Sequence, residues 1–232
     1  MKTTIKKALL LSVLAIASSQ SIAQKSVVVT ALAKHNLDES ILDEKLRAKP
    51  DEYAYDLKET VSTQGKEKVI LAQYDPSKNE GERWTVISED DQDPTTSEIK
   101  RFKKEHGKPA VPVMKIDEST YKIEKEEGNN LVISYKFDPA SLVEDNAFMK
   151  DCISYLTIDL KSGKIVKAEA VNEKPLKVKT FNVPTLNTYS ELTWSEADKR
   201  YLPKKDNITM AIKLLGQELM TTTIMEYSNF KK

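Results

Sequence analysis

From Tyr121 to the C-terminus, short apolar stretches alternate with polar turns, and this pattern limits the possible folds more than any other feature. Lys161-Ser162-Gly163 and Gly216-Gln217 have the composition of tight hairpin turns. Because the connections are short, the strands are expected to pair as an antiparallel meander. Strands are predicted at residues 121–123, 131–137, 153–160, 164–171, 176–183, 188–194, 207–215 and 218–230.

The first half of the chain adds strands at residues 53–57, 69–72 and 83–87, together with two short helices. Apolar residues recur at helical spacing between Asn36 and Pro50, and Asn36 or Asp38 can cap this helix. Thr95 and Glu98 form a capping box for a second helix, which is expected to stop near His106 at Gly107. Two or three short helices packed on antiparallel strands predict the α+β class.

Three prolines mark the ends of predicted strands. Pro175, Pro184 and Pro203 each lie beside a stretch that is predicted to be extended. Proline has no N–H for the hydrogen-bond ladder, so a strand end is where it does least harm.

Residues 1–23 have the pattern of a Sec-type signal peptide. Lys2, Lys6 and Lys7 precede an apolar run of about ten residues, and Ser21-Ile22-Ala23 supplies small residues at a cleavage site. A bilayer span needs about 20 residues, so this run is too short to remain as an anchor. We expect cleavage after Ala23, export to the periplasm, and one soluble mature domain over residues 24–232.

Charge and cysteine content exclude two further classes of protein. Without the three leader lysines, the 36 basic residues fall to 33 against 36 acidic ones, and the charges are interspersed. Such a surface offers no basic field for nucleic acid. Cys152 is the single cysteine, so an exported domain stapled by internal disulfides is excluded, and Cys152 is expected to be a buried structural thiol.

Motifs for catalysis or metal binding are scarce. His35 and His106 have no second ligand at metal-binding spacing, and no Gly-x-Ser-x-Gly sequence occurs. We interpret His106 as a residue that favours the negative end of its helix. The acidic residues at 89–93 could hold calcium but are better explained as a solvated turn before the helix. We therefore expect a non-enzymatic protein without a metal or cofactor.

One hairpin in the second half resembles a known family. Residues 156–169 end one strand in Asp159, turn through Ser162-Gly163, and return as an apolar and basic strand. This unit is similar to a hairpin of the periplasmic lipoprotein-carrier (LolA-like) superfamily, and Tyr201-Leu202-Pro203 and the closing 227–230 segment fit the same pattern. The resemblance covers about residues 115–232. The segment 74–95 resembles exported bacterial proteins of uncharacterised function.

The resemblance implies a curved, half-barrel-like sheet over helices, with an apolar hollow for acyl chains. Large apolar residues of the chain then either fill a core or line that hollow. For Trp84, a core anchor at the start of a strand is the simpler interpretation. The candidate lining residues are Trp84, Phe137, Phe181, Trp194, Met210, Ile212 and Ile224.

Three functions follow from this sequence. The first is binding of a hydrophobic envelope ligand, either lipid or the acyl chains of a lipoprotein. The second is an interaction module that offers a sheet edge to envelope proteins. The third is a hydrolase of unrecognised type. An apolar cavity would favour the first, and a filled core with an unpaired edge would favour the second.

Overall fold

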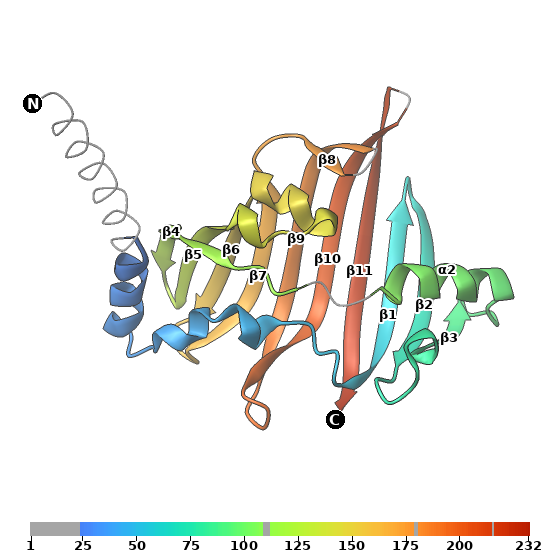
Figure 1. Ribbon diagram of the computed structural model, residues 1–232, viewed down its shortest axis with the longest axis horizontal. Helices are drawn as coiled ribbons and strands as arrows, with labels where there is room; N and C mark the ends of the chain where they lie inside the picture. The colour runs from blue at the N-terminus through green and yellow to red at the C-terminus, as the bar shows by residue number, and fades with distance from the viewer. Residues whose placement is uncertain (1–23, 109–111, 179–180, 215) are drawn as a thin grey trace, which may run out of the picture.

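The computed structural model describes residues 24–108, 112–178, 181–214 and 216–232; the predicted signal peptide lies outside them. The described chain forms one open antiparallel sheet of eleven strands with helices on one face (Figure 1), which confirms the α+β class. The strands are β1 (Ala54–Thr63), β2 (Lys66–Tyr74), β3 (Trp84–Glu89), β4 (Ile116–Glu127), β5 (Asn130–Phe137), β6 (Cys152–Asp159), β7 (Lys164–Asn172), β8 (Leu176–Val178), β9 (Phe181–Ser195), β10 (Arg200–Leu214) and β11 (Gln217–Lys231). The helical elements are residues 24–34, α2 (Thr96–His106), and the 3₁₀ segments η1 (Glu39–Leu42), η2 (Glu44–Arg47), η3 (Glu80–Glu82), η4 (Pro139–Ser141) and η5 (Glu144–Asp151).

The order of strands across the sheet is β3-β2-β1-β11-β10-β9-β7-β6-β5-β4, with β8 paired to β9. Two meanders are therefore joined where β1 pairs with β11, the first strand with the last. The prediction that every connection is short is wrong. The link from β3 to β4 runs from one edge of the sheet to the other, and it contains α2 (Figure 1).

Two predictions about the second half are also wrong. Residues 176–183 form not one strand but a hairpin, in which Val178 of β8 pairs with Phe181 of β9. Pro184 and Pro203 lie inside β9 and β10 rather than at their ends. The register between these two strands shifts beside each proline, so the missing N–H falls where the ladder is already interrupted. The other hairpins, including the 161–163 turn, are as predicted.

Alternation along the strands gives the sheet two different faces. Every second residue of β6 is buried beneath the helical segments, and Cys152 is one of them. Cys152 is 1 % exposed, which confirms a buried thiol, and burial raises its pKa to about 11. On the opposite face a row of paired residues alternates in charge across five strands: Lys58, Glu226, Lys205, Glu191 and Lys167. Opposite charges directly across strands stabilise such a solvent-facing surface.

The covered face carries two main apolar cores. The first core lies under residues 24–47 and includes Leu32, Leu42, Ile133, Leu156 and Tyr201. The second core lies under α2 and is largely aromatic, with Tyr55, Tyr74, Trp84 and Phe102. A smaller cluster around Cys152 and Leu176 lies next to η5.

The predicted helix between residues 36 and 50 is broken into two 3₁₀ segments. Asp38 caps η1 as predicted, through a side-chain bond from the amide of Ser40 at 2.8 Å. Asp43 then ends η1 and caps η2 by accepting from the amide of Lys45. Each aspartate competes for backbone N–H groups, which explains why no continuous α-helix forms.

The second predicted helix is confirmed with its boundaries. Thr95 and Glu98 make both bonds of the capping box, and Gly107 terminates α2. The indole of Trp84 donates to the carbonyl of His106 at 3.2 Å, which satisfies one of the carbonyls left free at the helix end. In the described part of the chain, no helix is long and apolar enough to cross a membrane.

Candidate ligand-binding site

The structure separates the seven candidate lining residues. Phe137 and Trp194 pack against the first core, Trp84 belongs to the second core, and Met210 packs beside the Cys152 cluster. Ile212 follows Met210 by two residues on β10 and shares its face. Trp84, as a core anchor, is 4 % exposed.

Two of the seven lie away from the covered face or at its margin. Ile224 pairs with Asn207 and Thr60 and points to the opposite face from its neighbour Met225, which packs on the second core. Phe181 is 45 % exposed at the β8–β9 turn. The set therefore does not form a single lining: Phe137 lines one cleft, and Trp194 lines a separate cleft of equal volume with Leu37 and Tyr201.

One cleft lies between the η2 segment, β5 and the chain that enters β4, and its volume is about 330 Å³. Tyr135 and Phe137 supply apolar surface from the sheet, and Val113 and Met114 supply it from the connection that follows α2. We call this site the cleft. Its lining residues are Glu44, Arg47, Ala48, Lys49, Asp51, Pro112, Val113, Met114, Tyr135 and Phe137.

The polar residues of the cleft are mostly engaged with the protein itself. Glu44 accepts from the amide of Ile116 at 2.8 Å, which ties η2 to the start of β4. Arg47 donates to the carbonyls of Ile41, Leu42 and Asp43, which closes the end of η1. Because these polar groups already have partners in the protein, the surface that the cleft offers to a ligand is mainly apolar.

A second, smaller hollow lies beside the cleft and shares Lys49 and Asp51 with it. Its volume is about 100 Å³ and its surface is more polar. We call it the polar pocket. Its lining residues are Lys49, Asp51, Tyr74, Glu80, Arg83, Trp84, His106, Gly107 and Lys108.

His106 is held firmly in the wall of the polar pocket. Its Nε2 lies 2.8 Å from Oε2 of Glu59, a carboxylate from β1 that is 6 % exposed. Its ring stacks on Phe102 at a centroid distance of 4.1 Å and meets Trp84 edge-on. His106 is therefore more than a residue at the end of a helix, because it links α2 to the middle of the sheet.

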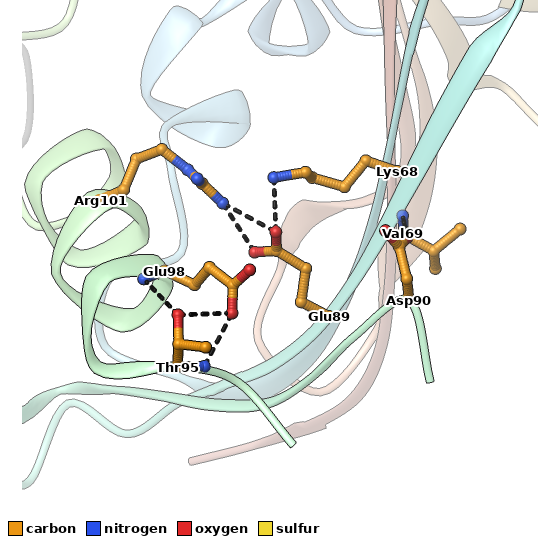
Figure 2. A network of polar contacts seen from close by, with 7 residues as sticks. All are labelled: Lys68, Val69, Glu89, Asp90, Thr95, Glu98 and Arg101. Atoms are coloured by element: carbon orange, nitrogen blue, oxygen red, sulfur yellow. Dashed lines mark hydrogen bonds and ion pairs between the residues drawn. The ribbon is translucent and has the colours of Figure 1, made fainter. Parts of the chain in front are cut away.

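The predicted solvated turn is confirmed for Asp90, Asp91 and Asp93, which are exposed, but not for Glu89. Glu89 is 7 % exposed, and its carboxylate accepts from Arg101 at 2.7 and 3.0 Å and pairs with Lys68 at 2.5 Å (Figure 2). Asp90 accepts from the amide of Val69 at 2.7 Å. These carboxylates are used to fasten α2 and β2 together, and the described residues contain no cluster of side chains suited to a metal ion.

Sequence reasoning missed most of the cleft. Tyr135 lies two residues before Phe137 and so shares its face of the predicted strand. The strand periodicity could therefore have identified Tyr135 as a lining residue. Val113 and Met114 follow Pro112 in a short apolar run outside any predicted element. Arg47 and Lys49 carry no local signal, because their place beside β5 arises only from the tertiary fold.

Comparisons of the chain with protein-family models, with curated proteins and with solved structures find no match. The residues of the cleft and of the polar pocket are therefore the basis for the function proposed below.

Proposed function

We propose that the protein binds a hydrophobic ligand of the bacterial envelope, such as a lipid or the acyl chain of a lipidated partner, without catalysing a reaction. The observation that carries the proposal is the cleft, in which Tyr135, Phe137, Val113 and Met114 present apolar side chains around about 330 Å³. Ligand pockets generally have about 300–1,000 Å³ and mostly apolar walls. Each buried CH₂ of a chain would contribute about 0.8 kcal/mol.

The proposed place of action is the periplasm, after Sec export and cleavage behind Ala23, and the proposed family is the lipoprotein-carrier superfamily. The mass of the protein recovered from the periplasm tests this location directly. A chain that begins at Gln24 is expected, and a chain that retains residues 1–23 would contradict it.

The ligand proposal is tested by native mass spectrometry of the mature protein, purified without detergent. Adducts of lipid mass that disappear after organic extraction are expected. A clean apo mass that takes up no added lipid would overturn the proposal. That result would favour the alternative function, in which the β3 edge of the sheet binds a protein partner. Ile87 is 47 % exposed on β3.

A matched pair of variants locates the ligand. Val113 is 44 % exposed in the cleft, whereas Val166 is 39 % exposed on β7 and does not line it. Binding of the neutral fluorophore N-phenyl-1-naphthylamine is expected to weaken in Val113→Asp and to remain unchanged in Val166→Asp. Equal effects of the two substitutions would contradict binding in the cleft.

A further inference from the structure

The polar pocket contains cations that the protein itself does not neutralise. Arg83 and Lys108 line it, and neither forms an ion pair with a carboxylate among the described residues. Arg83 is oriented by a bond from its Nε to the carbonyl of Lys78 at 3.3 Å. The lining also contains Glu80, which is exposed.

A third cation, Lys49, stands where the polar pocket meets the cleft. Its ammonium lies 3.5 Å from Asp51, and the two side chains are 51 % and 34 % exposed. Exposed ion pairs of this kind are weak. Lys49 can therefore leave Asp51 for a stronger anionic partner at little cost in free energy. Because Lys49 lines both hollows, that partner can lie in the cleft or in the polar pocket.

The position of these cations is not explained by the end of α2 alone. Cations are favoured near a helix C-terminus because the last carbonyls lack partners. Here, however, the carbonyl of His106 already accepts from Trp84 and the carbonyl of Lys103 accepts from Gly107. These two carbonyls therefore do not depend on the cations of the polar pocket for a partner.

The same two chain segments form walls of both hollows. Lys49 and Asp51 line both hollows, and the connection that follows α2 contributes Gly107 and Lys108 to the polar pocket and residues 112–114 to the cleft. An apolar wall and an unneutralised basic wall thus lie side by side along one boundary, marked by Lys49 and Asp51. A molecule with an apolar chain and a negatively charged end matches this arrangement.

We infer that the ligand is an anionic amphiphile, whose chain lies in the cleft and whose phosphate or carboxylate group is held in the polar pocket by Arg83, Lys108 and Lys49. This inference rests on the proposed function and adds the chemical class of the ligand. Charge-assisted hydrogen bonds are the strongest such contacts, and guanidinium geometry suits phosphate and carboxylate oxygens.

The test compares two probes with the same ten-carbon chain, decyl phosphate and decanol, by displacement of N-phenyl-1-naphthylamine. Decyl phosphate is expected to bind about tenfold more tightly or better, as one or two charge-assisted bonds would give. The double variant Arg83→Gln/Lys108→Gln is expected to lose this preference and to keep its affinity for decanol. Should the double variant not fold, Lys108→Gln alone is expected to lose part of the preference.

The matched control is Lys100→Gln/Lys104→Gln, which removes the same charge from exposed positions of α2 that do not line the polar pocket. It is expected to keep the preference for decyl phosphate. Equal binding of the two probes by the native protein would overturn the inference while leaving the proposed function in place. Binding of neither probe would overturn both. Inorganic phosphate that binds as tightly as decyl phosphate would also overturn the inference, because the chain would then contribute nothing.

Discussion

His106 Nε2 lies 2.8 Å from Glu59 Oε2, and this contact joins the last residue of α2 to the middle of β1. The carboxylate comes from a side chain that is almost fully buried, whereas the imidazole is 19 % exposed. Both ends of the contact lie on the covered face, next to the polar pocket. The pair therefore fixes where the long connection leaves α2 on its way to β4.

Replacing His106 by phenylalanine would keep an aromatic ring beside Phe102 and Trp84 but would leave the Glu59 carboxylate buried without its partner. Loss of one member of a buried pair costs about 3–5 kcal/mol, and the partial exposure of His106 reduces this to about 2 kcal/mol. Urea denaturation measures the change in the free energy of unfolding.

The second histidine provides the control for this prediction. His35 Nε2 lies 3.0 Å from Glu126, but both side chains of that pair are more exposed. His35→Phe is expected to leave the midpoint of urea unfolding nearly unchanged, because exposed pairs contribute little. Equal losses in His35→Phe and His106→Phe would show that burial of Glu59 does not decide the effect.

The capping box of α2 gives a second prediction. Thr95 accepts from the amide of Glu98 at 3.3 Å, and Glu98 in turn accepts from the amide of Thr95 at 2.7 Å (Figure 2). Thr95→Ala is expected to destabilise the protein by about 1 kcal/mol, as loss of an N-cap does. Thermal unfolding followed by circular dichroism measures the loss. Thr96→Ala, one residue further into the helix, should show no comparable loss, and a reversed ranking would exclude the cap as the cause.

Asp206 gives a prediction about pH. Tyr227 donates to its Oδ2 at 2.8 Å, while its Oδ1 is buried with no hydrogen-bond partner in the described chain. Burial raises the pKa of Asp206 above its ordinary value, against the opposing effect of the Ser190 and Tyr227 hydroxyls. The folded state therefore holds this proton more tightly than the unfolded state, and stability from this group is lost as pH rises through the raised pKa.

Asp206→Asn removes the loss of stability with rising pH because an amide does not ionise. The amide oxygen can still accept from Tyr227. The melting temperature of Asp206→Asn relative to the native protein is expected to rise as the pH is raised from about 4, the ordinary aspartate pKa, towards 7. Asp198→Asn is the control. A hydrogen bond from Ser195 lowers the pKa of Asp198, so the stability that this carboxylate contributes is lost below about pH 4 and the melting temperature of Asp198→Asn relative to the native protein should change little from about 4 to 7. Parallel plots of relative melting temperature against pH for the two variants would refute a raised pKa at Asp206.

Local signals explain which parts of the fold could be predicted from the sequence. The hairpin at Lys161-Ser162-Gly163, the capping box at Thr95 and Glu98, and the stop at Gly107 each depend on residues within a few positions of one another. The pairing of β1 with β11 depends on residues about 170 positions apart. Nothing in either strand records that partner, so the join between the two meanders could not be predicted.

The candidate site was hidden for the same reason. The cleft is assembled from residues 44–51, 112–114 and 135–137, and only Phe137 stood out as a large apolar residue in a predicted strand. The burial of Glu59 and Glu89 could not be predicted either. Their carboxylates are paired with side chains from other elements, namely His106, Arg101 and Lys68. Charged residues in a sequence are read as surface unless such partners are known.

Gly107 connects the end of α2 to the polar pocket, and it leads to the last prediction. Its φ of −81° is open to any residue, so backbone conformation does not require glycine. Space does: a Cβ built there would lie 2.5 Å from the carbonyl oxygen of Lys103. That oxygen is backbone and already accepts from the amide of Gly107 at 2.8 Å, so it cannot move away without weakening the helix end.

Gly107→Ala is therefore expected to destabilise the protein by about 1–3 kcal/mol, the usual cost of forcing atoms into a packed site. The measurement is urea denaturation, with Gly81→Ala as the control. Gly81 also lies near the polar pocket, but a Cβ there meets nothing within 4 Å, and its φ is not in the left-handed region. Gly81→Ala should be neutral or slightly stabilising, because it only restricts the unfolded chain. If Gly107→Ala were as stable as Gly81→Ala, the close approach of Gly107 to the Lys103 carbonyl would not be what shapes this wall of the pocket. If Gly107→Ala is destabilised as expected and also loses the preference for decyl phosphate over decanol, the same backbone contact that ends α2 also sets the position of Lys108.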